Sequence, residues 1–149
     1  MIRKPKVEMN SKGFTLVELS VVIVIIGVLA AFAVPKFRSA VERSKCGEAL
    51  NYLSSVASAE ERYAARQGTY ISDLTQLDIK MPAPKYFSVG AVQAGSTGDL
   101  EDSWSLTLTR LGASSGYGAY TVVYTDQGYD TQNSTLQASP DINPMATSS

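Results

Sequence analysis

The most informative part of the chain is Ser11–Leu19, whose sequence is SKGFTLVEL. From Leu19 the chain continues to Val34 without a charged residue, an uninterrupted apolar run of 16 residues. At 1.5 Å per residue, a helix over residues 14–35 would be about 33 Å long, enough to cross the hydrocarbon core of a membrane. We therefore expect residues 14–35 to form a helix that spans a membrane or packs among other apolar helices.

The charges on either side of residue 13 are of opposite sign. Residues 1–13 carry a net charge of +3, whereas residues 14–149 carry a net charge of -4. Lys and Arg resist translocation, so a basic segment before an apolar run is typical of a targeting leader. The mildly acidic remainder argues against general binding of nucleic acid, which usually needs a basic face.

Glu18 lies almost at the start of the apolar helix. A carboxylate within a spanning helix costs roughly 2.5–3.5 kcal/mol on insertion scales, so it needs a partner, a function or contact with water. If the helix stays in the membrane, Glu18 could remain wet at the interface. If the helix packs against copies of itself, the carboxylate needs a cation. Cleavage before Phe14 would expose an amine that could supply this cation on a neighbouring copy.

The joint pattern of basic leader, Gly13, Phe14, Glu18 and apolar run resembles the prepilin signature of type IV pilins and their pseudopilin relatives. The resemblance implies that a membrane peptidase cleaves between Gly13 and Phe14 and that the amine of Phe14 is methylated. It also implies that Glu18 is the glutamate used in assembly. Gly27 and Pro35 match the two positions at which the helix of this family is locally less regular and more easily bent.

The function implied by this resemblance is that of a major pilin, a structural subunit of a type IV pilus. The expected partners are copies of the chain in a helical filament, the prepilin peptidase and the inner-membrane assembly machinery. The precursor would lie in the bacterial inner membrane and the product in an extracellular pilus. Pili of this family support adhesion, twitching motility or DNA uptake, and the sequence does not select among these roles.

Other interpretations of the N-terminus remain open at this point. A pseudopilin of a type II secretion system or a minor pilin would share the whole signature. Ala31-Phe32-Ala33 also has the form that ordinary signal peptidase recognises, and cleavage there would release a secreted binding domain beginning at Val34. An uncleaved single-pass anchor is a weaker alternative.

Composition argues against catalysis. The chain has no histidine, which removes histidine-based triads, histidine metal sites and the commonest general base. Cys46 is the single cysteine, so no internal disulfide is possible, and its helical context predicts a small buried contact residue. We expect neither enzymatic activity nor a cofactor.

Residues 36–67 are predicted to continue the helix in amphipathic form. Pro35 should loosen or kink the helix at the junction, and Gly68 is a natural C-terminal stop. Apolar residues recur at spacings of three and four, which predicts one packed face. They are Ala49, Tyr52, Leu53, Val56, Ala59 and Tyr63. Polar residues, Arg43, Glu48, Glu60 and Arg66, are assigned to the opposite face.

Residues 68–149 are predicted to form a connecting loop and a small sheet. A short helix is expected at Asp73–Leu77, and strands are expected at Tyr86–Val92, Ser103–Leu111 and Ala119–Thr125. The simplest arrangement is an antiparallel sheet of three or four strands packed on the amphipathic helix. The predicted fold class is therefore α+β, in agreement with the fold that the resemblance implies.

The chain from Asp130 onward is polar and is expected to form a surface loop or loose tail. Many type IV pilins close this region with a disulfide, and this chain cannot. Asp126, Asp130 and Asp141 offer oxygen atoms of the kind that bind calcium, but their spacing matches no established loop. We interpret them as solvated surface acids and expect no metal site.

Overall fold

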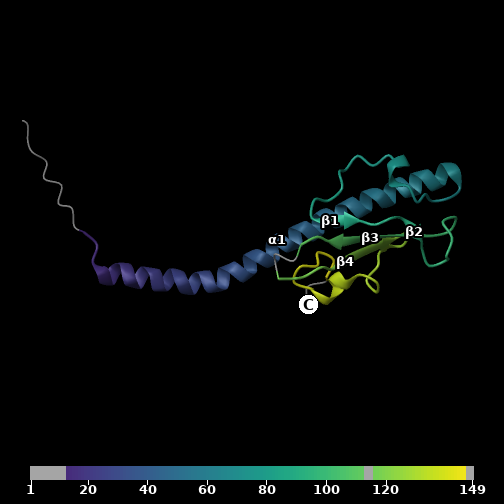
Figure 1. The fold of residues 1–149 in the computed structure, drawn as a ribbon. Helices are drawn as coiled ribbons and strands as arrows, with labels where there is room; N and C mark the ends of the chain where they lie inside the picture. Colours follow the sequence, from purple (N-terminus) through teal and green to yellow (C-terminus); the bar gives the residue numbers. More distant parts are fainter. Residues whose placement is uncertain (1–12, 113–115, 147–149) are drawn as a thin grey trace, which may run out of the picture. The chain divides into compact units, whose positions relative to one another are not determined.

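The computed structural model describes residues 13–112 and 116–146. The chain divides into two compact units, residues 1–36 and residues 37–149. Helix α1, Leu16–Gln67, contributes to both units (Figure 1). We call the described part of the first unit, residues 13–36, the N-terminal segment, and the second unit the head.

Helix α1 begins two residues later than predicted and ends at the predicted residue, with Pro35 inside it. In the head, five of the six predicted apolar stripe residues are buried, and Tyr63 is half-buried against the core. The predicted packed face of the helix is therefore confirmed. The prediction for Glu60 was wrong, because Glu60 lies on the packed face and is completely buried.

The head contains one antiparallel sheet with the order β1-β3-β4-β5, and β2 also pairs with β3. Its strands are β1 (Phe87–Val89), β2 (Gln93–Ala94), β3 (Trp104–Arg110), β4 (Thr121–Thr125) and β5 (Gly128–Tyr129). The predicted α+β class is confirmed. Five strands occur where three or four were expected. Of the first predicted strand, Tyr86–Val92, only Phe87–Val89 forms a strand, and the two-residue strands β2 and β5 were not foreseen.

Strands β1 and β2 lie on the same side of β3, because β4 pairs along its other side. Gly90 follows β1 and approaches β3 closely. A Cβ atom at Gly90 would lie 2.9 Å from the carbonyl oxygen of Thr107, closer than a side chain tolerates. The Gly90 N–H donates a hydrogen bond to the same oxygen at 3.0 Å, which holds the chain between β1 and β2 against β3.

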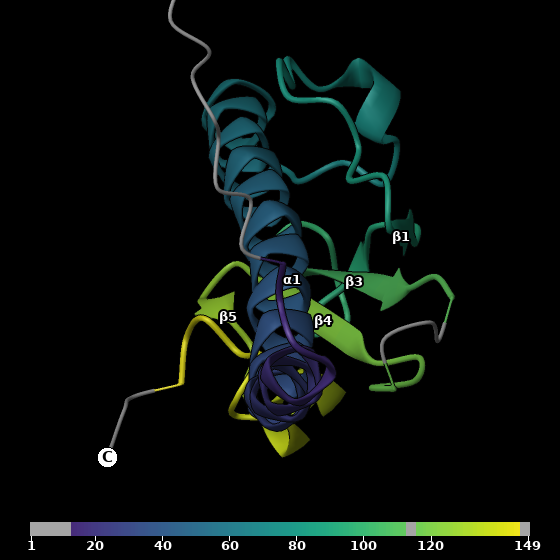
Figure 2. The same cartoon turned by 90° about the vertical axis from the view of Figure 1, so that its left-hand side faces the viewer.

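The core of the head lies between α1 and one face of the sheet, an arrangement that Figures 1 and 2 both show. Trp104, Leu106 and Leu108 alternate along β3 and are completely buried. The ring centroid of Trp104 lies 6.4 Å from that of Tyr70 and 6.4 Å from that of Tyr124. The inward-facing residues of the strands, which alternate along each strand, therefore pack against the apolar stripe of α1 in a single core.

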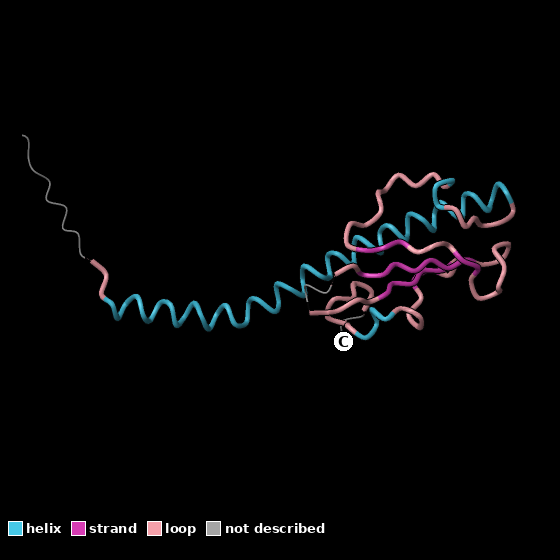
Figure 3. The backbone as a smooth tube through the Cα atoms, viewed as in Figure 1, coloured by secondary structure: helices cyan, strands magenta, loops and turns pink. Residues whose placement is uncertain are grey.

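A long loop joins α1 to β1 (Figure 3). It contains the short 3-10 helix η1, Leu74–Gln76, within the predicted helical range. The side chain of Asp73 caps η1 by accepting a hydrogen bond from the Thr75 N–H, at 3.0 Å. Leu77 is buried in the core and Ile71 is half-buried against it, so this loop is part of the packed head.

The prediction of a loose tail from Asp130 was wrong. Residues Thr135–Ala138 form a second 3-10 helix, η2. Leu136 and Ile142 are completely buried in the core cluster. The polar composition concealed this anchoring because only these two large apolar side chains reach the core, too few to produce a recognisable period.

Hydrogen bonds attach the same segment to β4. The Val123 N–H donates to Ser134 Oγ at 2.8 Å, and the Thr121 N–H donates to Thr135 Oγ1 at 2.7 Å. In return, the Thr135 N–H donates to Thr121 Oγ1 at 3.3 Å. Side-chain hydroxyls thus satisfy backbone donors on the edge of β4, and the segment is held without a disulfide.

If Leu136 anchors this segment, Leu136→Ala should lower the free energy of unfolding of the head by about 2–5 kcal/mol, because it leaves a cavity in a closed core. Urea unfolding of the detergent-solubilised chain, followed by the fluorescence of Trp104, would measure the loss. Met145→Ala is the matched control, since that side chain is 57% exposed and should have little effect. Equal stability of the two variants would show that Leu136 does not anchor the segment.

Candidate processing and assembly site

Gly13 and Phe14 precede the first turn of α1 and are exposed. Phe14 is 82% exposed, and no atom lies within 4 Å of the position that a Cβ of Gly13 would take. The backbone around the bond between them is neither helix nor strand. A protease would therefore meet no steric barrier from the described residues at this bond.

Thr15 and Glu18 form a reciprocal cap at the start of α1. Glu18 Oε2 accepts hydrogen bonds from the Thr15 N–H at 2.8 Å and from Thr15 Oγ1 at 2.9 Å. Thr15 Oγ1 in turn accepts from the Glu18 N–H at 3.2 Å. This is the capping-box pattern, which satisfies amide groups that the first turn of a helix leaves free. Within the described residues, Glu18 Oε1 has no hydrogen-bond partner, so one oxygen is left for another molecule.

No described residue covers any face of the apolar run Leu19–Val34. Each large apolar side chain in this run is at least 48% exposed. The helix contains a stretch long and apolar enough to cross a membrane, judged by length and composition. An α-helix that is apolar on all sides is stable only in lipid or among other apolar helices.

Gly27 and Pro35 both lie within the helix. No atom lies within 4 Å of the position that a Cβ of Gly27 would take, so nothing in the described chain requires glycine there. Pro35 has no N–H and cannot bond to the carbonyl of Ala31, which weakens the helix at that turn. If a small residue is required at position 27, the requirement comes from another molecule.

The family model for the prokaryotic N-terminal methylation motif matches residues 9–34. Three similar proteins extend beyond this motif. The fimbrial protein EcpC of Eikenella corrodens is 38% identical over 87 residues, covering 58% of this chain and 57% of that protein. The type IV wide pilus major component PilA4 of Thermus thermophilus is 36% identical over 91 residues, covering 58% of this chain and 70% of that protein. A fimbrial protein of Pseudomonas aeruginosa is 30% identical over 109 residues, covering 70% of this chain and 71% of that protein.

The chain belongs to the type IV pilin family. The family model matches residues 9–34, the chain covers 70% and 71% of the length of two relatives, and the α+β head is of the kind expected for a pilin. The chain spans a little over half the length of the Eikenella relative. The prepilin resemblance of the first residues is thereby confirmed.

The head of this pilin contains a buried polar cluster that the sequence analysis missed. Glu42 from α1 is completely buried and accepts hydrogen bonds from Arg110 Nε at 2.5 Å and from Arg110 Nη2 at 3.1 Å. The Tyr120 hydroxyl donates to Glu42 Oε1 at 2.8 Å and also lies 2.9 Å from Cys46 Sγ. Lys45 Nζ donates to Glu42 Oε2 at 3.3 Å. The cluster joins the helix to β3 and to the residue just before β4.

Periodicity could have revealed two members of this cluster. Glu42 precedes Cys46 by four residues and Ala49 by seven, on the packed stripe of the helix. Arg110 follows Trp104, Leu106 and Leu108 in the inward alternation of β3. Charged residues at core positions are rare unless paired, and here each is the partner of the other.

The electrostatics of the cluster favour charged Glu42 and uncharged Cys46. Burial raises the pKa of Glu42, but hydrogen bonds from Arg110, Tyr120 and Lys45 outweigh it and lower the pKa from 4.5 to about 2. Burial raises the pKa of the Cys46 thiol, which therefore stays protonated and unreactive. The prediction of a buried contact role for Cys46 is confirmed.

Glu60, at the other end of the packed stripe, is bound differently. Its Oε2 accepts a hydrogen bond from the Ile71 N–H at 3.0 Å, and its Oε1 has no partner among the described residues. Burial raises the pKa of Glu60 against the opposing effect of this hydrogen bond. The carboxyl group anchors the start of the loop that follows α1.

The three aspartates considered for calcium do not converge. Asp130 accepts hydrogen bonds from its own turn, namely from the backbone of Gln132 and from the backbone and side chain of Asn133. Asp141 accepts from the Tyr117 hydroxyl at 2.7 Å. Within residues 13–112 and 116–146, no group of three acidic, cysteine or histidine side chains is placed to hold a metal ion.

Glu42→Gln should destabilise the head at neutral pH by about 3–5 kcal/mol, because it leaves the Arg110 charge buried without its partner. The lowered pKa of Glu42 contributes about 3 kcal/mol of stability above pH 4.5, and this contribution is lost as the pH falls toward about 2. The stability difference between the original chain and the variant should therefore shrink over that interval. Urea unfolding at a series of pH values measures it.

Glu48→Gln is the control for this experiment, since Glu48 lies on the same helix and is exposed. It should leave stability nearly unchanged at every pH. A constant difference between Glu42→Gln and the original chain from pH 7 to pH 2 would contradict the assignment of a charged, paired Glu42.

Proposed function

We propose that the chain is a major structural subunit of a type IV pilus, processed between Gly13 and Phe14 and polymerised through its N-terminal helix. The observation that carries the proposal is the apolar run Leu19–Val34, which no described residue covers. Copies of this run packed together would remove it from water or lipid without requiring another protein. The relatives support the proposal, since the Thermus thermophilus protein is named a pilus major component.

Glu18 would set the axial register of the filament. Its Oε2 already completes the cap with Thr15, whereas Oε1 has no partner among the described residues. Cleavage before Phe14 would create an amine two residues ahead of Leu16, the first residue of α1, and four residues ahead of Glu18. We propose that this amine, on a neighbouring subunit, pairs with Oε1, since a charge buried among apolar helices requires a partner.

Gly27 and Pro35 would act in packing and in adjustment of the helix. The open space at Gly27 would let a neighbouring helix approach the backbone closely, as small residues do in packed apolar helices. The missing hydrogen bond at Pro35 would let the helix adapt between the membrane and the filament. We also propose methylation of the Phe14 amine, which the match of residues 9–34 to the N-terminal methylation motif supports.

The partners and location follow from this role. The precursor would lie in the bacterial inner membrane, with the basic residues of the leader on the cytoplasmic side. The prepilin peptidase and the assembly machinery would act on it there, and the product would be an extracellular filament. The role is structural and requires no catalytic group or cofactor.

Gly13→Asp should block processing, because a charged side chain replaces the hydrogen atom next to the bond that is cut. Intact-mass measurement of the protein in membranes should find the uncleaved precursor, with Gly13→Ala showing a partial defect. Gly27→Ala serves as the control and should be cleaved normally. A mature chain that begins at Val34 in the original protein would instead establish release by ordinary signal peptidase.

Glu18→Ala should leave processing intact but greatly reduce or abolish filaments, because the register pair is lost. The measurement is the yield of filaments sheared from cells, together with the intact mass of the subunit that remains in the membrane. Ser20→Ala is the matched control, since among the described residues the Ser20 hydroxyl bonds to the Val17 carbonyl of its own helix and to no other group. Normal filament yield from Glu18→Ala would contradict the pairing.

A further inference from the structure

One end of the head is basic. At the end where α1 enters the head, the side chains of three cations surround the ring of Tyr86. The distances from the ring centroid are 4.6 Å to Lys45 Nζ, 5.9 Å to Lys85 Nζ and 5.6 Å to Arg110 Cζ. Among the described residues, Glu42 is the only carboxylate that forms a salt bridge with any of these cations. We call the three cations, Tyr86 and the neighbouring Leu111 the basic end.

Part of the basic end is accessible to a partner. Lys85 is exposed, and the side chains of Tyr86 and Leu111 are 39% and 51% exposed. The Leu111 N–H donates to the Tyr86 carbonyl at 2.8 Å, which keeps the two residues together. Hydrogen bonds to Glu42 hold Lys45 and Arg110 in place. Exposed apolar side chains beside fixed cations suit a protein partner that presents carboxylates.

The opposite end of the head is acidic. Asp99, Glu101 and Asp102 are exposed in the loop between β2 and β3. The Tyr70 N–H donates to the Leu100 carbonyl at 2.9 Å, so this loop lies beside the chain that follows α1. None of the three carboxylates forms a salt bridge within the described part of the head. We call residues 99–102 the acidic loop.

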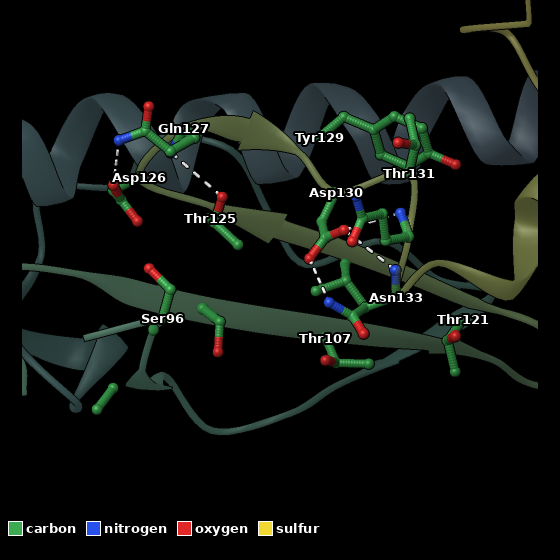
Figure 4. A pocket seen from close by; sticks show the side chains of 15 residues that line it. Ser96, Thr107, Thr121, Thr125, Asp126, Gln127, Tyr129, Asp130, Thr131 and Asn133 are labelled. Carbon is green, nitrogen blue, oxygen red and sulfur yellow. Dashed lines mark hydrogen bonds between the residues drawn. The ribbon is translucent and has the colours of Figure 1, made fainter. Parts of the chain in front are cut away.

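A further carboxylate, that of Asp126, lies at the same end. The Asp126 N–H donates to the carbonyl of Trp104, the first residue of β3, at 3.4 Å. Asp126 also lines a groove of about 720 Å³ on the face of the sheet that is turned away from α1. Figure 4 shows Asp126 and Ser96 at the same end of this groove, and none of the residues that line it is basic. The surroundings of the acidic loop therefore add negative charge.

The two ends are too far apart to meet within one head. Strand β3 runs from Trp104, close to the acidic loop, to Arg110 at the basic end. Its six steps of about 3.3 Å separate the ends by about 20 Å. Figures 1 and 3 show the loop between β2 and β3 and the far end of β3 at opposite ends of the head. A salt bridge needs a separation of about 4 Å or less, so the acidic loop cannot pair with Lys85 of the same chain.

A second copy of the chain supplies the missing partner for both ends. In a polymer of parallel subunits every head has the same polarity, so a contact between successive heads joins two different surfaces. Unlike charges then face each other, whereas two equal ends would repel. We propose that the basic end of each head binds the acidic loop of the next head in the filament. This inference rests on the proposed function, because it requires parallel copies joined through their N-terminal helices.

The first test is carbodiimide cross-linking of filaments sheared from cells, since this reagent joins an amine directly to a carboxylate. The expected product links Lys85 to Glu101 or Asp102, and mass spectrometry of the digested filaments would identify it. Because the two ends of one head are about 20 Å apart, this link forms only between subunits. Detergent-solubilised subunits are the control and should not give the link.

The second test is reversal of charge at each end. Lys85→Glu should lower the filament yield at least about fivefold, because like charges then face each other, and Glu101→Lys with Asp102→Lys should do the same. The three substitutions together restore opposite charges and should return the yield to within about twofold of the original. The matched controls are Lys80→Glu and Glu48→Lys, which reverse exposed charges outside the two ends and should leave the yield unchanged.

Intact mass and unfolding followed by Trp104 fluorescence verify that each variant is cleaved and folded. The inference is overturned if filaments of the original chain give no such link, or if the combined variant is as defective as the separate reversals. It is also overturned if Lys85→Glu weakens only the binding of subunits to vesicles that contain phosphatidylglycerol, which would make the basic end a lipid-binding surface. In these outcomes the original chain still forms filaments and the proposed function stands. Failure of the original chain to form any filament would remove both.

Discussion

The packed face of α1 between Glu42 and Glu60 is the constraint on which the head depends. Its apolar side chains cover one face of the sheet, and each end of the face carries a buried carboxyl group. At one end Glu42 joins Arg110 and Tyr120, which belong to β3 and to the entry of β4. At the other end Glu60 holds the loop that begins after the helix. The helix therefore fixes the positions of the sheet and of the loop through the same set of contacts.

The two parts of α1 differ in how their apolar side chains are covered. In the head, the helix has one buried face and one exposed face, and the sheet of the same chain covers the buried face. In the N-terminal segment no face is covered, and the apolar surface is stable only in lipid or among copies of itself. This difference gives a pilin both a compact head with its own core and a helix whose apolar surface needs lipid or other helices around it. The cap formed by Thr15 and Glu18 begins that helix and leaves Glu18 Oε1 without a partner among the described residues.

The two faces of the sheet are also used differently. The inner face supplies the core, while hydroxyl groups cover the outer face around the groove. The last segment of the chain contributes to both faces. Leu136 and Ile142 reach the core, and Asp130 and Asn133 form part of the rim of the groove. The segment that holds this head together without a disulfide thus also lines the groove on the outer face of the sheet.

The sequence by itself determined the class of the protein, the extent of α1, the packed stripe and the position of the three main strands. These features depend on local periodicity or on a dense motif near Gly13, and both are visible in a one-dimensional pattern. Only the tertiary structure decided that Glu42, Arg110 and Tyr120 meet, that Glu60 is buried, and that the polar end of the chain is anchored. The physical reason is that a buried charge or an isolated apolar anchor is stabilised by partners far away in sequence. Glu42 and Arg110 are 68 residues apart, and no local pattern contains both.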